Sequence, residues 1–285
     1  MQLKEKVAAF SGLLKTELPI AAGICVVAGE IIYLGHLPTV LQAILGFLTG
    51  FLISGSAMVS NDYFDLNVDR INHPERPLPS GKVTVPELTA FTLLLSISGF
   101  STAALLGLFP FLAAVVIWAV GIVYNWRLKE TGLPGNAMVA ASVASTIVFG
   151  GLVVGGLASG LVWTFGGLAF LFDLGEEIAG GAMDKEGDKE RSGKSLANRK
   201  GKKFALHVTG LVFAGFVALS LVPFLAGWLG FPYLTIILAA DCATSCFTFK
   251  LLNSKNPIEG RKQIRHLYLT LTFAITAIAI LRVIV

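Results

Sequence analysis

One stretch decides the fold, an apolar run at 39–60 that ends in Asn61-Asp62-Tyr63-Phe64-Asp65-Leu66-Asn67-Val68-Asp69-Arg70. The apolar run is long enough to cross a bilayer as a helix, and three carboxylates follow at its end. Successive helical residues lie about 100° apart, so a continuing helix would place one amide and three carboxylates within an arc of about 100°. These residues are Asn61, Asp62, Asp65 and Asp69. We therefore expect a dense anionic face at one end of a membrane-spanning helix.

Apolar runs of similar length recur along the whole chain. Of the 285 residues, 54% are hydrophobic and 14% are charged, whereas roughly a quarter of an ordinary soluble domain is charged. Crossing a hydrocarbon core of about 30 Å takes about 20 helical residues. Nine runs are suitable, at 17–35, 39–60, 88–107, 111–126, 137–157, 162–181, 204–227, 232–251 and 266–284. The sequence predicts an all-α membrane protein with nine transmembrane helices in a single domain, residues 1–285.

The links between these runs alternate in charge. Four links contain neither Lys nor Arg, and they alternate with links that are rich in both. With nine spans, every basic residue except Arg282, of 22 in total, falls on the side of the N-terminus. Cytoplasmic loops carry the excess of Lys and Arg in membrane proteins. We expect a multi-pass protein of the cell membrane whose N-terminus and acidic motifs are cytoplasmic.

The net charge of +4 thus reflects orientation in the lipid bilayer. Binding of nucleic acid would need basic residues on a soluble face with aromatic platforms, and the sequence offers neither. No feature points to an obligate protein partner.

The acidic face at 61–69 needs a positively charged partner. Carboxylates packed together repel one another unless a cation or several hydrogen-bond donors neutralise them. Magnesium prefers oxygen ligands and typically bridges one or two protein carboxylates to phosphate oxygens of a substrate. The pattern therefore indicates a Mg²⁺ site, and the alternative is an acidic helix end facing solvent.

A loop rich in proline follows the acidic face. Residues 72–82 contain three prolines and a glycine, which prevent a helix and impose a shaped loop. Arg70, Arg76 and Lys82 in or beside this loop either face a phosphate or are ordinary inside-facing charges.

A second acidic constellation ends the sixth run. Asp184 and Asp188 are spaced i, i+4, and on a continuous helix they share an arc of about 80° with Asp173 and Glu177. The alternative is a helix that breaks near Gly180, because each of the glycines at 180 and 181 costs about 1 kcal/mol relative to alanine inside a helix. Ionisable residues at membrane depth usually face a bundle interior or a wet cavity. Two acidic clusters that face one cavity would hold a diphosphate through magnesium ions.

Together the motifs resemble the UbiA superfamily of intramembrane prenyltransferases. Asn61-Asp62-x-x-Asp65-x-x-x-Asp69 matches the first Asp-rich motif of that superfamily, and Asp184-x-x-x-Asp188 is similar to the second. The segment 124–129, followed by Gly135-Asn136, resembles the tyrosine and lysine segment after the fourth span, and the phrase at 76–81 completes the set. The resemblance covers nearly the whole chain.

The resemblance implies a central cavity that is capped on the cytoplasmic side and open laterally to lipid. It also implies an isoprenyl diphosphate donor, most simply a geranylgeranyl one, a lipophilic acceptor and Mg²⁺. Asn61 and the five aspartates of the two motifs would hold the magnesium ions and the diphosphate. Lys129 and Arg70 would offset charge as diphosphate leaves, with Arg76 and Lys82 also on the diphosphate. Tyr124 would stabilise an allylic cation through its ring face or anchor the membrane interface.

The acceptor stays open at this point. The phrases at 61–65 and 76–81 most resemble the archaeal digeranylgeranylglyceryl phosphate synthases, which join a geranylgeranyl chain to geranylgeranylglyceryl phosphate. Chlorophyll synthases carry a similar phrase, and the acceptor could also be an aromatic quinone precursor. The chain departs from the archaeal subgroup at Glu176 and Gly180, where basic residues are expected. The alternative from another functional class is an ion-coupled transporter, because four acidic residues lie within apolar runs: Glu30, Asp173, Glu177 and Asp241. A transporter would place its essential carboxylates near the midplane of the bilayer. The densest acidic clusters here lie at the cytoplasmic rim instead.

Overall fold

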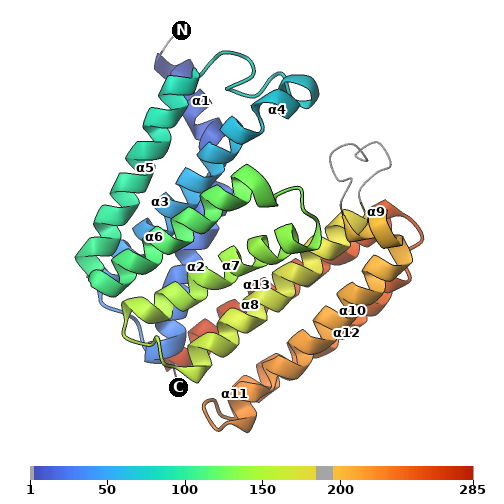
Figure 1. The fold of residues 1–285 in the computed structure, drawn as a ribbon. Helices are drawn as coiled ribbons and strands as arrows, with labels where there is room; N and C mark the ends of the chain where they lie inside the picture. The colour runs from blue at the N-terminus through green and yellow to red at the C-terminus, as the bar shows by residue number, and fades with distance from the viewer. Residues whose placement is uncertain (1–2, 184–194, 285) are drawn as a thin grey trace.

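The computed structural model describes residues 3–183 and 195–284 as a bundle of helices, and those residues contain no strand. Figure 1 shows α1 at one end of the bundle and the end of α13 at the other. In chain order the elements are α1 (Leu3–Leu14), α2 (Glu17–Leu34), α3 (Val40–Phe64), α4 (Leu66–Asn72), α5 (Val85–Leu106), α6 (Leu108–Val123), the π-helical turn η1 (Tyr124–Leu128), α7 (Leu133–Val153), α8 (Gly160–Met183), α9 (Leu196–Lys200), α10 (Lys202–Ser220), α11 (Val222–Leu225), α12 (Phe231–Leu252) and α13 (Pro257–Ile284).

Eight stretches in the described part of the chain are long and apolar enough to span a membrane. They are α2, α3, α5, α6 with η1, α7, α10 with α11, α12 and α13. A ninth long helix, α8, has 24 residues and carries three acidic side chains, Asp173, Glu176 and Glu177. These nine segments correspond to the nine runs predicted from the sequence, so the all-α membrane fold is confirmed. The helix α8 also runs through both glycines at 180 and 181, which excludes a break near Gly180.

The helix starts follow local sequence signals. Before α3, the Thr39 hydroxyl accepts from the Gln42 N–H while the Gln42 side chain accepts from the Thr39 N–H. Thr84 and Glu87 form the same reciprocal pair before α5. Such a pair satisfies N–H groups that the first helical turn leaves without partners. The starts of α3 and α5 are therefore determined by their local sequence.

Glycine allows α2 and α7 to pack closely. A Cβ placed on Gly29 would lie 2.2 Å from the Ile147 carbonyl oxygen, and one on Gly150 would lie 2.0 Å from the Val26 carbonyl oxygen. Only a residue without a side chain fits such a contact, as is common between membrane helices. At the far end of α2, the Arg282 Nε donates to the Ile32 carbonyl at 3.1 Å. This contact ties the last helix to the first long one.

The segment before the first predicted run, 17–35, is itself helical. It forms the helix α1, which packs on α3. Its Leu13 is fully buried, and the Phe10 and Phe91 rings meet edge to face at 5.0 Å. Because α1 is anchored by apolar contacts, the turn after it is held over the acidic end of α3.

An apolar cavity of about 30 Å³ lies among the helices that follow. It is lined by residues of α2, α7, α8, α10, α12 and α13, including Ile32, Ile147, Phe165, Ile237 and Ile278. Ligand pockets are usually about 300 Å³ or larger. This cavity is therefore smaller than a usual ligand pocket.

Candidate active site

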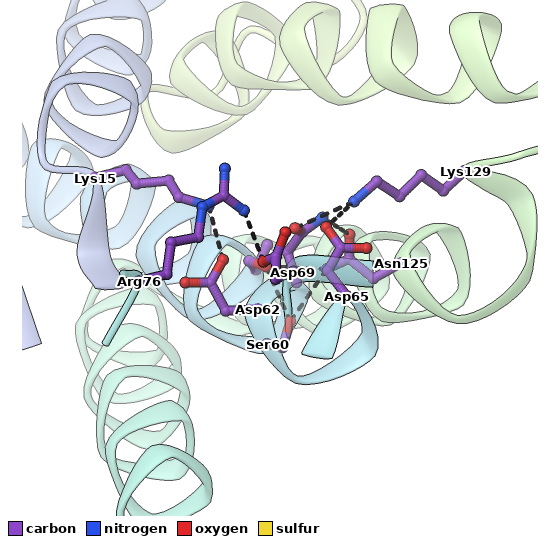
Figure 2. A network of polar contacts seen from close by, with 10 residues as sticks. Lys15, Ser60, Asp62, Asp65, Asp69, Arg76, Asn125 and Lys129 are labelled. Atoms are coloured by element: carbon purple, nitrogen blue, oxygen red, sulfur yellow. Dashed lines mark hydrogen bonds and ion pairs between the residues drawn. The ribbon is translucent and has the colours of Figure 1, made fainter. Parts of the chain in front are cut away.

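The acidic stretch at the end of α3 keeps its helical spacing. The α-helix ends at Phe64 and α4 begins at Leu66, but the Asp65 N–H still donates to the Asn61 carbonyl at 2.9 Å. The Asp69 N–H likewise donates to the Asp65 carbonyl at 2.8 Å. Figure 2 shows the three carboxylates gathered in one network. The predicted anionic face is therefore present at this end of the bundle.

Each carboxylate of this network is paired with a cation from a different part of the chain (Figure 2). The Lys15 Nζ lies 2.7 Å from Asp62, and the Arg76 Nη1 lies 2.7 Å from Asp69. The third pair joins Lys129 to Asp65. These pairs neutralise carboxylates that would otherwise repel one another.

The carboxylates are more deeply buried than their cations. The side chains of Asp62 and Asp69 are 3% and 1% exposed, whereas those of Lys15 and Arg76 are 34% and 30% exposed. The Lys129 side chain is also 30% exposed. The fixed part of the site is thus anionic, and its positive groups lie on the open side.

Lys129 is positioned by the π-helical turn η1. Within this turn, the buried Asn125 donates to the Ala57 carbonyl at 2.9 Å and to the Ser60 hydroxyl at 3.1 Å. It also accepts from the Asn61 side chain at 3.1 Å. Three bonds therefore lock η1 against α3, and π-helical turns of this kind occur frequently at functional sites.

Sequence reasoning missed two members of this network. Lys15 was counted only among the inside-facing charges, yet it reaches Asp62 across 47 positions of the chain. It has a φ of 47°, a left-handed conformation that L-residues rarely adopt. Asn125 lies between the motif residues Tyr124 and Lys129, and that neighbourhood was the one signal that could have identified it.

The other basic residues of the loop lie further out. Arg70 and Lys82 are exposed. The Lys82 carbonyl accepts from Lys6, whose ammonium group also pairs with Glu87 at 2.7 Å. The structure therefore brings Arg76 and Lys129 to the carboxylates but leaves Arg70 and Lys82 at the surface.

The half-buried Tyr124 connects this network to α8. Its hydroxyl lies within electrostatic range of Asp65 and of Asp173 and Glu177 of α8. On α8, Asp173 is 8% exposed, and its Oδ2 has no hydrogen-bond partner within residues 3–183 and 195–284. Acidic groups of both α3 and α8 therefore lie within electrostatic range of Tyr124.

The second Asp-rich motif, Asp184 and Asp188, lies outside the described residues. Among the residues that the structure does describe, no three His, Cys, Asp or Glu side chains could hold a metal ion together. Magnesium usually keeps several waters and uses one or two carboxylates together with phosphate oxygens. The carboxylates of the first motif fit that donor set, but they do not form a complete metal site by themselves.

Two further buried acids belong to other surroundings. Asp241 of α12 accepts from the Ser220 hydroxyl at 2.7 Å, and Tyr233 donates to the Ser220 carbonyl at 2.6 Å. Glu30 is fully buried, and its carboxyl oxygens have no hydrogen-bond partner among the described residues. Asp241 therefore joins α10 to α12, while no contact within the described part of the chain gives Glu30 a role.

Comparison with known proteins agrees with this architecture. The UbiA prenyltransferase family matches residues 18–279, which is most of the chain. The chain belongs to this family. It is therefore a multi-pass membrane prenyltransferase, and the expectation from its motifs is confirmed.

Several relatives within the UbiA family share a name. The digeranylgeranylglyceryl phosphate synthase of Thermococcus kodakarensis is 34% identical over 237 residues, covering 83% of this chain and 84% of the relative. The synthase of that name from Methanopyrus kandleri is 35% identical over 219 residues, covering 77% and 79%.

Solved structures extend the likeness to three dimensions. A digeranylgeranylglyceryl phosphate synthase structure gives a TM-score of 0.86 at 26% identity, covering 99% of this chain and 100% of that chain. A UbiA homologue from Archaeoglobus fulgidus bound to GPP and Mg²⁺ gives 0.67 at 21% identity, covering 95% and 99%. The second likeness concerns the fold alone.

Proposed function

We propose that this UbiA family member is a digeranylgeranylglyceryl phosphate synthase. It would transfer a geranylgeranyl group from its diphosphate to the free hydroxyl of geranylgeranylglyceryl phosphate. The observation that carries the proposal is the network of three carboxylates, two of them buried, each paired with a partly exposed cation. The curated relatives supply the choice of acceptor.

The proposed donor site uses Mg²⁺ on the carboxylates of both Asp-rich motifs. A UbiA homologue with the same fold has been solved with GPP and Mg²⁺, and the carboxylate oxygens here are of the kind that magnesium prefers. When bound, the metal would supply positive charge to the leaving diphosphate. Asn61, Asp62, Asp65 and Asp69, with Asp184 and Asp188, are the residues proposed to hold it.

The cations on the open side complete the donor site. Lys129 and Arg76 hold their carboxylates before the donor enters, and from these positions their side chains can rotate onto diphosphate oxygens. Charge that develops on the leaving group is stabilised best by groups already in place. Lys15 occupies an equivalent position on Asp62, so we add it to the proposed set. Arg70 and Lys82 would attract the anionic donor electrostatically from the protein surface.

Tyr124 would act on the allylic cation that remains when diphosphate leaves. Its side chain lies within electrostatic range of Asp65 and of two carboxyls of α8, and its aromatic face would stabilise an allylic cation near them. An allylic cation is quenched by water, so the apolar walls of the bundle favour transfer to the acceptor over hydrolysis.

The proposed orientation places this site at the cytoplasmic face. Every Lys and Arg except Arg282 falls on the side of the N-terminus when the nine spans are counted, as the positive-inside rule requires. Arg282 lies at the opposite end, on the last residues of α2.

The test is mass spectrometry of products from the purified full-length protein. It is given geranylgeranyl diphosphate, Mg²⁺ and one of three acceptors: geranylgeranylglyceryl phosphate, an aromatic quinone precursor or chlorophyllide. A prenylated glycerol phosphate supports the proposal. Product on a ring acceptor alone would keep the prenyl transfer and replace the acceptor, and absence of any product would contradict the proposed function.

A further inference from the structure

The acceptor side of the site is suggested by one contact between α8 and α13. The Tyr268 hydroxyl lies 3.4 Å from Glu176 Oε2, beyond the usual 2.5–3.0 Å of an O–H···O hydrogen bond. The Tyr268 ring packs edge to face on Phe172 at 5.6 Å, yet 43% of the residue is exposed. The contact is therefore weak, and the exposed side of Tyr268 leaves the two polar groups accessible to a third one.

The described residues leave the surface of α8 beside Glu176 uncrowded at Gly180. Gly180 is one helical turn nearer the basic end of the bundle, and a Cβ placed on it would meet only one described side-chain atom within 4 Å, Glu176 Oε1 at 3.9 Å. On the other side, Asp173 has a buried oxygen that no described residue bonds. The groups that interact electrostatically with Glu176 are Tyr268 from α13 and the carboxyls of Asp173 and Glu177 from α8 itself.

Positive charge lies further along the same side of α13. Arg261, Arg265 and Tyr268 are all exposed and lie within an arc of about 60°, because helical residues are about 100° apart. Arg265 precedes Tyr268 by three residues, a rise of about 4.5 Å along the helix axis. One face of α13 thus presents guanidinium groups at the rim and a tyrosine hydroxyl about one turn deeper.

We propose that this seam between α8 and α13 binds a lipid phosphate that carries a free hydroxyl, and that Glu176 accepts the proton of that hydroxyl. The phosphate lies against Arg265 and Arg261 at the rim. The hydroxyl lies deeper, between Tyr268 and Glu176. This inference rests on the proposed function, in which such a lipid is the acceptor.

The reaction balances with these groups. The acceptor oxygen forms a bond to the first carbon of the isoprenyl chain, and the bond from that carbon to the diphosphate breaks. The diphosphate leaves with the bonding electron pair, and the proton of the acceptor hydroxyl passes to the Glu176 carboxylate. Ether formation at a hydroxyl needs such a base, and positioned acid–base groups contribute about 10²–10⁴-fold to rates.

The experiment compares two readouts in full-length protein, diphosphate release from geranylgeranyl diphosphate and ether formation with geranylgeranylglyceryl phosphate. Glu176→Gln should lower kcat for ether formation by about 100-fold or more, with little change in the acceptor KM. Diphosphate release without acceptor should stay at the wild-type rate, because the donor site is intact. Arg265→Gln should raise the acceptor KM about tenfold and leave kcat unchanged, since it removes a charge-assisted bond to the phosphate.

Two further variants sharpen the result. Gly180→Leu should raise the acceptor KM by filling the space beside Glu176, and leucine at this position is favourable for the helix itself. Lys262→Gln is the matched control for Arg265, because Lys262 lies on the same end of α13 but about 100° around from Arg261. It should behave as wild type.

The inference is overturned if Glu176→Gln and Arg265→Gln form ether with wild-type kcat and KM. It is also overturned if Glu176→Gln loses diphosphate release, because Glu176 would then belong to the donor site. A wild-type protein that makes no ether with the glycerol phosphate would overturn the proposed function first and this inference with it.

Discussion

Replacing Lys15 with glutamine should destabilise the protein in the absence of magnesium. Lys15 lies 2.7 Å from Asp62, whose side chain is 3% exposed. Without that ammonium group the buried carboxylate would lie beside Asp69 with one cation fewer. The lost charge is therefore expected to affect both folding and donor binding.

The magnitude follows from the burial of the pair. An exposed ion pair contributes about 0.2–1 kcal/mol, whereas removing one member of a fully buried pair costs about 3–5 kcal/mol. Here Asp62 is buried and Lys15 is 34% exposed, so we expect a loss of about 2 kcal/mol, between these limits. That loss should lower the thermal midpoint by several degrees.

Magnesium should reverse much of this loss. A ligand that binds only the folded state stabilises it by linkage, and a divalent cation would replace the charge that Lys15 supplied. The assay is thermal unfolding of the purified protein with and without Mg²⁺, together with steady-state kinetics. We expect a larger Mg²⁺-dependent rise in Tm for Lys15→Gln than for wild type. We also expect kcat/KM for the donor to fall about tenfold or more, equivalent to about 1.4 kcal/mol.

Lys6→Gln is the matched control, because Lys6 forms a 2.7 Å pair with Glu87 in which the side chains are 29% and 38% exposed. Its effect should be below about 1 kcal/mol and independent of Mg²⁺. A Lys15→Gln protein with the wild-type Tm, Mg²⁺ response and kcat/KM would refute the reasoning.

Three other substitutions test the scaffold. Asn125→Ala removes three side-chain hydrogen bonds that hold η1 on α3; since each contributes about 0.5–1.5 kcal/mol, both Tm and kcat should fall, and unchanged kcat would show that η1 does not position Lys129. Gly150→Ala would place a Cβ 2.0 Å from the Val26 carbonyl oxygen, so a destabilisation of about 1–3 kcal/mol is expected in unfolding measurements; a Tm equal to wild type would contradict the close packing. Arg282→Gln removes a donor to the last carbonyls of α2 and should cost about 0.3–1 kcal/mol without altering turnover; a fall in kcat would mean that this end of the bundle is coupled to the site.

Sequence periodicity was enough to predict the long helices and the acidic face. Hydrophobic length determines what can cross a bilayer, and a helical period determines that Asp62, Asp65 and Asp69 lie together. The family motifs also led to Lys129 and Arg76, because their positions were fixed relative to the carboxylates by the resemblance.

The partners of those carboxylates could not be predicted in the same way. Lys15 reaches Asp62 only because α1 packs on α3 and a left-handed residue turns the chain. A single basic residue before an apolar run looks the same whether it faces water or a carboxylate. The π-helical turn is similarly invisible, since it depends on how Asn125 meets α3 and not on a periodic signal.

Of the proposed acceptor site between α8 and α13, the sequence singled out Glu176 but not Tyr268. Glu176 was noted as a departure from the archaeal subgroup, but its partner Tyr268 is 92 positions away. Only the packing of α13 against α8 brings the two together.

The most direct test of the central claim, that the acidic end of α3 drives magnesium-dependent release of diphosphate, is the rate of that release in Asp65→Asn. The substitution keeps the shape of the side chain and removes the charge that faces Lys129. Glu75→Gln, at an exposed position in the same segment, is the control. We predict that Asp65→Asn folds normally and loses diphosphate release by about 100-fold or more, while Glu75→Gln keeps the wild-type, Mg²⁺-dependent rate. An Asp65→Asn protein that releases diphosphate at the wild-type rate would contradict the assignment of this site.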